Sequence, residues 1–240
     1  MEYLISCYRR QGERGCSLLL QHYLCRQTPV CFACICTAEE PGAEACRAAV
    51  EGLRVWGRSI PWQKAAKHPE GWLRRLEKEL SALPAVSSPA AEGEASADCR
   101  AAAGEFRLTM LLCIGREILA LGGGQNLLLV NTSLGTGRIT PLPGTFRGCI
   151  EPGAGLLLAT DGFLQNAGEE RIGEVLRLSE IRTQEQADRH LRELLRFREV
   201  LDYREAVIPA GKAVSRAAAA GKQAAVLLIG REGKTGVSGR

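Results

Sequence analysis

An apolar run that stops at a single acidic residue sets the first limit on the fold of this chain. The run reads Leu156-Leu157-Leu158-Ala159-Thr160-Asp161-Gly162-Phe163. A short continuous apolar run is typical of a buried strand, so Asp161 stands where a strand leaves the core. A carboxylate at that position is costly unless a metal ion, a cation or several hydrogen-bond donors compensate its charge. We therefore expect a partner for Asp161.

The charge balance argues against nucleic-acid binding. The chain has 240 residues, of which 45% are hydrophobic, as in an ordinary globular protein. Its 31 basic and 27 acidic residues are scattered along the whole length without a basic block, and only 5% of its residues are aromatic. Few side chains are therefore available to stack on bases, and we expect no nucleic-acid partner.

Neither a membrane segment nor a signal peptide is visible in the sequence. The most apolar region, Leu108 to Val130, is interrupted by Arg116 and Glu117, and the N-terminus lacks the basic start and apolar middle of a signal peptide. The ten cysteines lie mostly inside apolar runs, where a reduced thiol packs as a small hydrophobic side chain. We expect a cytoplasmic protein without a membrane partner, whose thiols fill the core.

The first half of the chain contains strand patterns followed by helix patterns. Runs rich in apolar, β-branched and aromatic residues predict strands at Tyr3–Tyr8, Cys16–Cys25 and Val30–Cys36. Apolar residues on one face of a 3.6-residue period predict helices at Pro41–Trp56 and Pro69–Leu83. The first of these helices is expected to pack on the sheet that the strands form.

The second half returns to strands and then to helices. Strands are predicted at Phe106–Ile114, Glu117–Leu121, Gln125–Asn131, Phe146–Ile150, Leu156–Thr160 and Ala224–Ile229, and helices at Glu169–Leu178, Gln184–Leu201 and Ala210–Ala220. Residues 84–104 consist mainly of Ala, Ser, Pro, Gly and Glu, which predicts a flexible excursion. We expect residues 1–230 to form a single domain that includes this excursion, followed by a loose basic tail at 231–240.

This order of elements favours two antiparallel sheets with helices outside over a parallel series of β-α-β units. The chain resembles the metal-dependent protein phosphatases of the 2C type, the PPM-type serine/threonine phosphatases. Leu156–Phe163 is similar to the family's apolar strand ending in Asp-Gly, and Ile118–Val130 resembles its strand pair around Gly-Asp-Ser, written here as Gly123-Gly124-Gln125. Phe32–Leu53 and Ala213–Ile229 match two further segments by position. The resemblance implies an α+β fold, in which two antiparallel β-sheets form a sandwich flanked by helices in α-β-β-α order.

The departures from the family's pattern concern its metal centre. In the family, several carboxylates hold a pair of Mg²⁺ or Mn²⁺ ions, which activate a bridging water. Where the family has Asp-Gly after its early strand, this chain reads Thr37-Ala38-Glu39-Glu40-Pro41-Gly42, and where it has Asp-Asn before its last strand, this chain reads Gly221-Lys222-Gln223. The acidic pair near the second strand is replaced by Cys16-Ser17-Leu18-Leu19. Only Asp161 clearly remains as a remnant of the catalytic site, so we expect no bound cofactor.

Four further residues become candidates through the resemblance. Lys222 stands about where a metal-binding aspartate belongs, and its ammonium could neutralise Asp161 in place of the ions. Arg14 lies in the segment where the family has a phosphate-contacting arginine. Glu39 or Glu40 could replace the missing early aspartate as a metal ligand. The structural alternatives are a helix N-cap or turn role for Asp161, and solvated surface positions for the two basic residues.

Three functions are consistent with these patterns. The first is a pseudophosphatase, a regulatory module that binds a protein partner such as a kinase or a phosphoprotein. The alternative is an active Mn²⁺- or Mg²⁺-dependent serine/threonine phosphatase that uses Asp161 together with Glu39 or Glu40. The third is a structural protein that keeps the fold as a scaffold.

Overall fold

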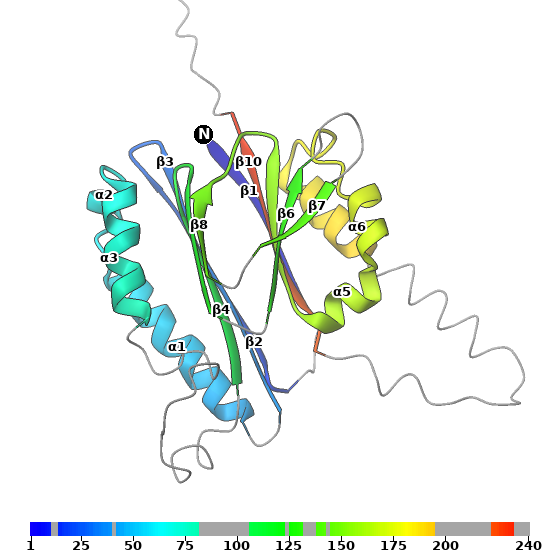
Figure 1. Cartoon of the computed structure of the whole chain (residues 1–240), viewed down its shortest axis with the longest axis horizontal. Helices are drawn as coiled ribbons and strands as arrows, with labels where there is room; N and C mark the ends of the chain where they lie inside the picture. Colours follow the sequence, from blue (N-terminus) through cyan, green and yellow to red (C-terminus); the bar gives the residue numbers. More distant parts are fainter. Residues whose placement is uncertain are drawn as a thin grey trace, which may run out of the picture.

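The computed structural model describes residues 1–10, 14–39, 42–81, 106–122, 125–131, 138–142, 145–194 and 222–232. The excursion predicted at 84–104, Glu40, the helix predicted at 210–220 and the tail from residue 233 lie outside these ranges. Within the described ranges, the chain forms two five-stranded antiparallel sheets that pack face to face, with helices on both outer sides (Figure 1). The predicted α+β sandwich in α-β-β-α order is confirmed.

The first sheet has the strand order β1-β10-β9-β6-β7. Its strands are β1 (Glu2–Arg9), β6 (Asn126–Asn131), β7 (Arg138–Leu142), β9 (Ala154–Ala159) and β10 (Ala224–Arg231). Every residue of β9, and every residue of β10 except the last, is buried. Apart from Arg231 at the end of β10, both strands are apolar, because other elements cover this sheet on both faces.

The second sheet has the strand order β2-β3-β4-β5-β8. Its strands are β2 (Cys16–Cys25), β3 (Thr28–Ala38), β4 (Phe106–Ile114), β5 (Glu117–Gly122) and β8 (Phe146–Cys149). A two-residue turn joins β2 to β3, and its residues Arg26 and Gln27 have positive φ angles of 52° and 68°. Two positive φ angles are the mark of a type I′ turn, whose twist matches that of the flanking strands. The turn fixes the register of the hairpin, with Cys25 opposite Thr28.

Helices cover the outer face of each sheet. The second sheet carries α1 (Ala43–Ser59), α2 (Trp62–Ala65) and α3 (Pro69–Ser81), and the first carries α5 (Asp161–Ala167), α6 (Glu169–Val175) and a helix that is described over 184–194 (Figure 1). The apolar core is accordingly divided into one layer between the sheets and one layer under each group of helices.

None of the described helices is both long enough and apolar enough to cross a lipid bilayer.

Three short elements, β7, α2 and α5, are missing from the sequence-based prediction. The two helices have four and seven residues, which is too short for a helical period to stand out. Pro141 weakens the strand pattern of β7, because proline lacks the main-chain N–H that a central strand needs. The helix predicted at Glu169–Leu178 is shorter than expected and ends at Val175.

Most of the described cysteines pack in the core, as the sequence predicts. Buried free thiols are found at Cys16, Cys25, Cys31, Cys34, Cys36, Cys46 and Cys113, whereas those of Cys7 and Cys149 are exposed. Burial raises the pKa of the Cys31 thiol to about 12, because the charged thiolate cannot be solvated there. This thiol therefore stays protonated and behaves as a small apolar side chain.

Candidate functional site

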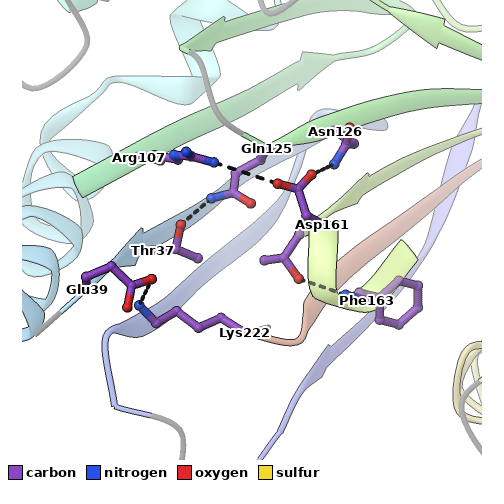
Figure 2. Close-up of polar contacts among 9 residues, drawn as sticks. Thr37, Glu39, Arg107, Gln125, Asn126, Asp161, Phe163 and Lys222 are labelled. Carbon is purple, nitrogen blue, oxygen red and sulfur yellow. Dashed lines mark hydrogen bonds and ion pairs between the residues drawn. The ribbon is translucent and has the colours of Figure 1, made fainter. Parts of the chain in front are cut away.

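Strands of both sheets begin or end together at one end of the sandwich, and their polar side chains meet there (Figure 2). In the second sheet, Thr37 near the end of β3 pairs with Arg107 near the start of β4. In the first sheet, Ala159 at the end of β9 pairs with Asn126 on one side and with Ala225 on the other. The fold thus brings together residues that are widely separated in the sequence.

Thr160 determines how the chain turns from β9 into α5. It is the N-cap of this helix, with an extended backbone, and its Oγ1 accepts a hydrogen bond from the main-chain N–H of Phe163 at 3.2 Å. The same oxygen accepts a bond from the N–H of Ala224 at 3.1 Å, which ties the cap to β10. Because Thr160 takes the capping role, the Asp161 carboxylate is not needed as a cap. Asp161 is instead the first residue of the helix, where a negative charge interacts favourably with the helix dipole.

Asp161 has two partners from neighbouring strands. Asn126 donates a hydrogen bond from Nδ2 to Asp161 Oδ1 at 2.6 Å, and the Arg107 guanidinium lies 3.7 Å from Oδ2 (Figure 2). The Asp161 side chain is 58% exposed, so water shares in solvating its charge. The expectation that Asp161 has a partner is confirmed, and the cation in question is Arg107.

Lys222 contacts the end of β3 instead of Asp161. Its Nζ lies 3.1 Å from Glu39 Oε1 (Figure 2). The same ammonium donates a hydrogen bond to the carbonyl oxygen of Ala38. Gly15 leaves the space for this contact, since a Cβ there would lie 2.2 Å from the Ala38 oxygen and 3.2 Å from Lys222 Nζ. Of the predicted site residues, the structure therefore pairs Lys222 with Glu39 and places Asp161 in a separate pair.

Gln125 connects the two sheets beside these ion pairs. Its Nε2 donates a hydrogen bond to Thr37 Oγ1 at 2.7 Å, and its side chain is nearly buried (Figure 2). Gln125 directly precedes β6 in the first sheet, whereas Thr37 belongs to β3 in the second. The bond therefore holds the two sheets together at the end where Asp161 lies.

The structure says less about the two remaining candidates, Arg14 and Glu40. Arg14 is exposed and lies in the turn that leads into β2. Glu40 lies outside the described residues. The phosphate-binding role of Arg14 and the metal-binding role of Glu40 stay predictions.

The described residues do not fit a binuclear metal centre. Over the described ranges, no three His, Cys, Asp or Glu side chains gather in a way that could hold an ion. Asp161 and Glu39, which lie at this end of the sandwich, each face a basic side chain. Mg²⁺ and Mn²⁺ need several oxygen ligands each, and the charges of Arg107 and Lys222 would repel them.

Sequence comparison and structural comparison give different results. No protein-family model matches this chain, and no curated protein matches its sequence. Solved structures do match over nearly its whole length. Phosphatase Stp1 from Staphylococcus aureus has 13% identity and a TM-score of 0.56, with 97% of this chain and 95% of Stp1 covered. The S. agalactiae serine/threonine phosphatase has 11% identity and a TM-score of 0.54, with 96% and 100% covered.

A third similar structure contains metal ions. It is the catalytic domain of the serine/threonine phosphatase PstP in complex with two manganese ions, with 12% identity, a TM-score of 0.50, and 95% of this chain and 96% of that chain covered. At such low identity the likeness establishes the fold. The fold is that of the 2C-type serine/threonine phosphatases, as the resemblance implied.

Proposed function

We propose that this chain, which has the fold of the 2C-type phosphatases, is a degenerate member of that family and acts as a pseudophosphatase. Its role in this proposal is regulatory: it binds a protein partner, a kinase or a phosphoprotein, over the end of the sandwich where Asp161 lies. The observation that supports the proposal most is the pairing of Asp161 with Arg107 and of Glu39 with Lys222. Protein cations compensate the carboxylates that an active enzyme would offer to metal ions.

Electrostatics gives the physical reason. Two divalent ions in one site repel each other and need several anionic ligands to offset that repulsion. Here Asp161 and Glu39 already have basic partners, so a divalent ion that bound to them would have to displace Arg107 or Lys222 and bind beside its remaining charge. The described side chains thus disfavour the two-metal chemistry of the family.

A metal titration tests the inactive state. We expect calorimetry with Mn²⁺ to show no binding in the micromolar range, and we expect no hydrolysis of p-nitrophenyl phosphate above the buffer rate. The Asp161→Asn variant should give the same results as the unchanged protein, because the carboxylate has no metal to hold. Two Mn²⁺ bound at micromolar affinity, with turnover that disappears in Asp161→Asn, would instead establish the active alternative with Glu39 or Glu40 as a ligand.

Capture from native lysate tests the binding surface. The charge reversal Arg107→Glu should reduce recovery of a specific partner at least about tenfold, because it changes the sign of an exposed side chain in the proposed interface. The matched control is Arg74→Glu, which makes the same change at an arginine of similar exposure on the outer helix α3. Equal recovery of the same proteins by both variants would contradict a binding role for this end of the sandwich.

A cytoplasmic location is part of the proposal. It is supported by the seven buried free thiols of the described residues, since core cysteines that pack as apolar side chains suit a reducing compartment.

A further inference from the structure

The edges of the two sheets differ in how well they are protected. In the described part of the chain, the edge strands are β1 and β7 in the first sheet and β2 and β8 in the second. An edge strand exposes unpaired main-chain groups, so proteins usually shorten it, cover it, or place charges or proline on it.

Three of these edges carry such protection. The Gln184 side chain covers β1, because its Oε1 accepts a hydrogen bond from the N–H of Ile5 at 3.1 Å and its Nε2 donates to the carbonyl of the same residue. β7 has five residues and includes Pro141. β8 has four residues, and Arg147 within it forms an ion pair with Glu77 of α3.

The edge of β2 lacks these features. The strand has ten residues and contains no Asp, Glu, Lys, Arg or Pro. Arg9 donates to the carbonyl of Cys16 at 3.3 Å and so occupies the start of the edge. Beyond that point, among the described residues, no hydrogen bond closes the outer side of the strand.

The hairpin geometry shows which main-chain groups face outward. In a hairpin with a two-residue turn, the residues that flank the turn exchange hydrogen bonds, and every second residue does the same along the ladder. Cys25 flanks the turn here, so the odd-numbered residues of β2 bond to β3. Gly15, which is also odd-numbered, follows the same rule: its carbonyl accepts a hydrogen bond from the N–H of Ala38 at 2.7 Å. The main-chain groups of Leu18, Leu20, His22 and Leu24 therefore point to the free edge.

The side chains of these four residues also share one face of the sheet. Leu18 and Leu20 pack partly into the apolar layer between the two sheets. Leu24 follows on the same face and is 69% exposed, which makes it one of two large hydrophobic side chains that are exposed in the described residues. Leu18, Leu20 and Leu24, with the exposed His22 between the last two, thus lie beside the unpaired main-chain groups, and the row ends on an uncovered leucine.

We propose that β2 pairs with β2 of a second copy of this chain, in antiparallel orientation about a two-fold axis at Gln21. This register places Leu18 opposite Leu24 and Leu20 opposite His22, so that every outward main-chain group meets another outward group. The two copies of the second sheet would then form one continuous sheet.

The chemistry of β2 favours a second copy as the occupant. A two-fold axis brings each side chain near the same set of side chains, so a charged strand would meet its own charge. β2 has no carboxylate, ammonium or guanidinium group to cause this repulsion. The pairing also covers Leu24 with Leu18 of the second copy, which removes apolar surface from water at both ends of the contact. This inference rests on β2 alone and does not depend on the proposed function.

Sedimentation equilibrium over a wide concentration range tests the inference. We expect the mass to rise from that of one chain to that of two chains and to stop there, because a two-fold contact closes on itself. Leu24→Lys should raise the dissociation constant at least about tenfold, since it places a charge on the edge and removes an apolar contact. The matched control is Val55→Lys, at the other exposed hydrophobic side chain, 61% exposed on α1, which should leave the dissociation constant unchanged.

A second variant separates edge pairing from other causes. His22→Pro removes an outward N–H and leaves the hydrogen bonds to β3 in place, so circular dichroism should be unchanged while association is lost. The inference is overturned if the unchanged protein stays a single chain at the highest concentration. It is also overturned if a dimer forms and both Leu24→Lys and His22→Pro leave its dissociation constant unchanged.

Discussion

Replacement of Phe163 by alanine is expected to lower the free energy of unfolding by about 3–5 kcal/mol, measured by urea denaturation. The Phe163 ring is fully buried in the apolar layer between the first sheet and its helices. Its centroid lies 6.1 Å from that of the Tyr8 ring on β1. The loss combines the transfer of a large apolar side chain with the cavity that the neighbouring side chains cannot fill.

The position of Phe163 in the fold makes this substitution informative about the site. Phe163 anchors the first turn of α5, the turn that begins with Asp161. The matched control is Phe106→Ala at the start of β4, where the ring is only partly buried and the loss should be clearly smaller. A Phe163→Ala variant as stable as Phe106→Ala would mean that α5 does not pack as described.

Replacement of Gly122 by alanine is expected to cost roughly 3–5 kcal/mol of unfolding free energy. Gly122 ends β5 with φ of +119°, a conformation that side chains with a Cβ rarely adopt. A Cβ built at this residue would lie 2.1 Å from the carbonyl oxygen of Leu108 and 3.0 Å from the Cα of Thr109. Both neighbours are main-chain atoms of the paired strand β4, so no side-chain rotation can relieve the clash.

Gly52→Ala provides the matched control for Gly122. Gly52 lies on the exposed side of α1, and a Cβ there would meet no atom within 4 Å. Alanine should stabilise this helix by about 0.5–1 kcal/mol, because it loses less conformational entropy on folding than glycine does. The two substitutions should therefore shift the urea midpoint in opposite directions. A stabilising effect of both would show that the backbone of Gly122 differs from the one described.

The sequence carried enough information for most of the fold. The runs Leu156–Thr160 and Ala224–Ile229 are apolar at every position except Thr160, and both form buried strands of the first sheet. The helices predicted from Pro41 and Pro69 are present as α1 and α3, because each repeats an apolar face over several turns. A helical pattern can be recognised only when it repeats over several turns, which explains why the short helices α2 and α5 are not predicted from the sequence.

The site was predictable only in part. The end of a buried strand made Asp161 stand out, and the structure gives it a cation and a hydrogen-bond donor as partners. Arg107 was missed, because nothing in its local sequence separates it from other surface arginines. It comes to this end of the sandwich through the register of β3 with β4, in which it pairs with Thr37. Such a partner becomes visible only when the pairing of distant strands is known.

The exposure of the pair between Arg107 and Asp161 has a consequence for how this surface can evolve. Arg107 and Asp161 are 66% and 58% exposed, whereas Lys222, opposite Glu39, is only 20% exposed. An ion pair exposed on both sides, such as that of Arg107 with Asp161, contributes at most about 1 kcal/mol to folding. Neutral drift can therefore exchange Arg107 without unfolding the protein. Single substitutions can thus change the charge of this surface during evolution with little effect on folding. The protein can acquire a different partner in this way while the sandwich beneath stays intact.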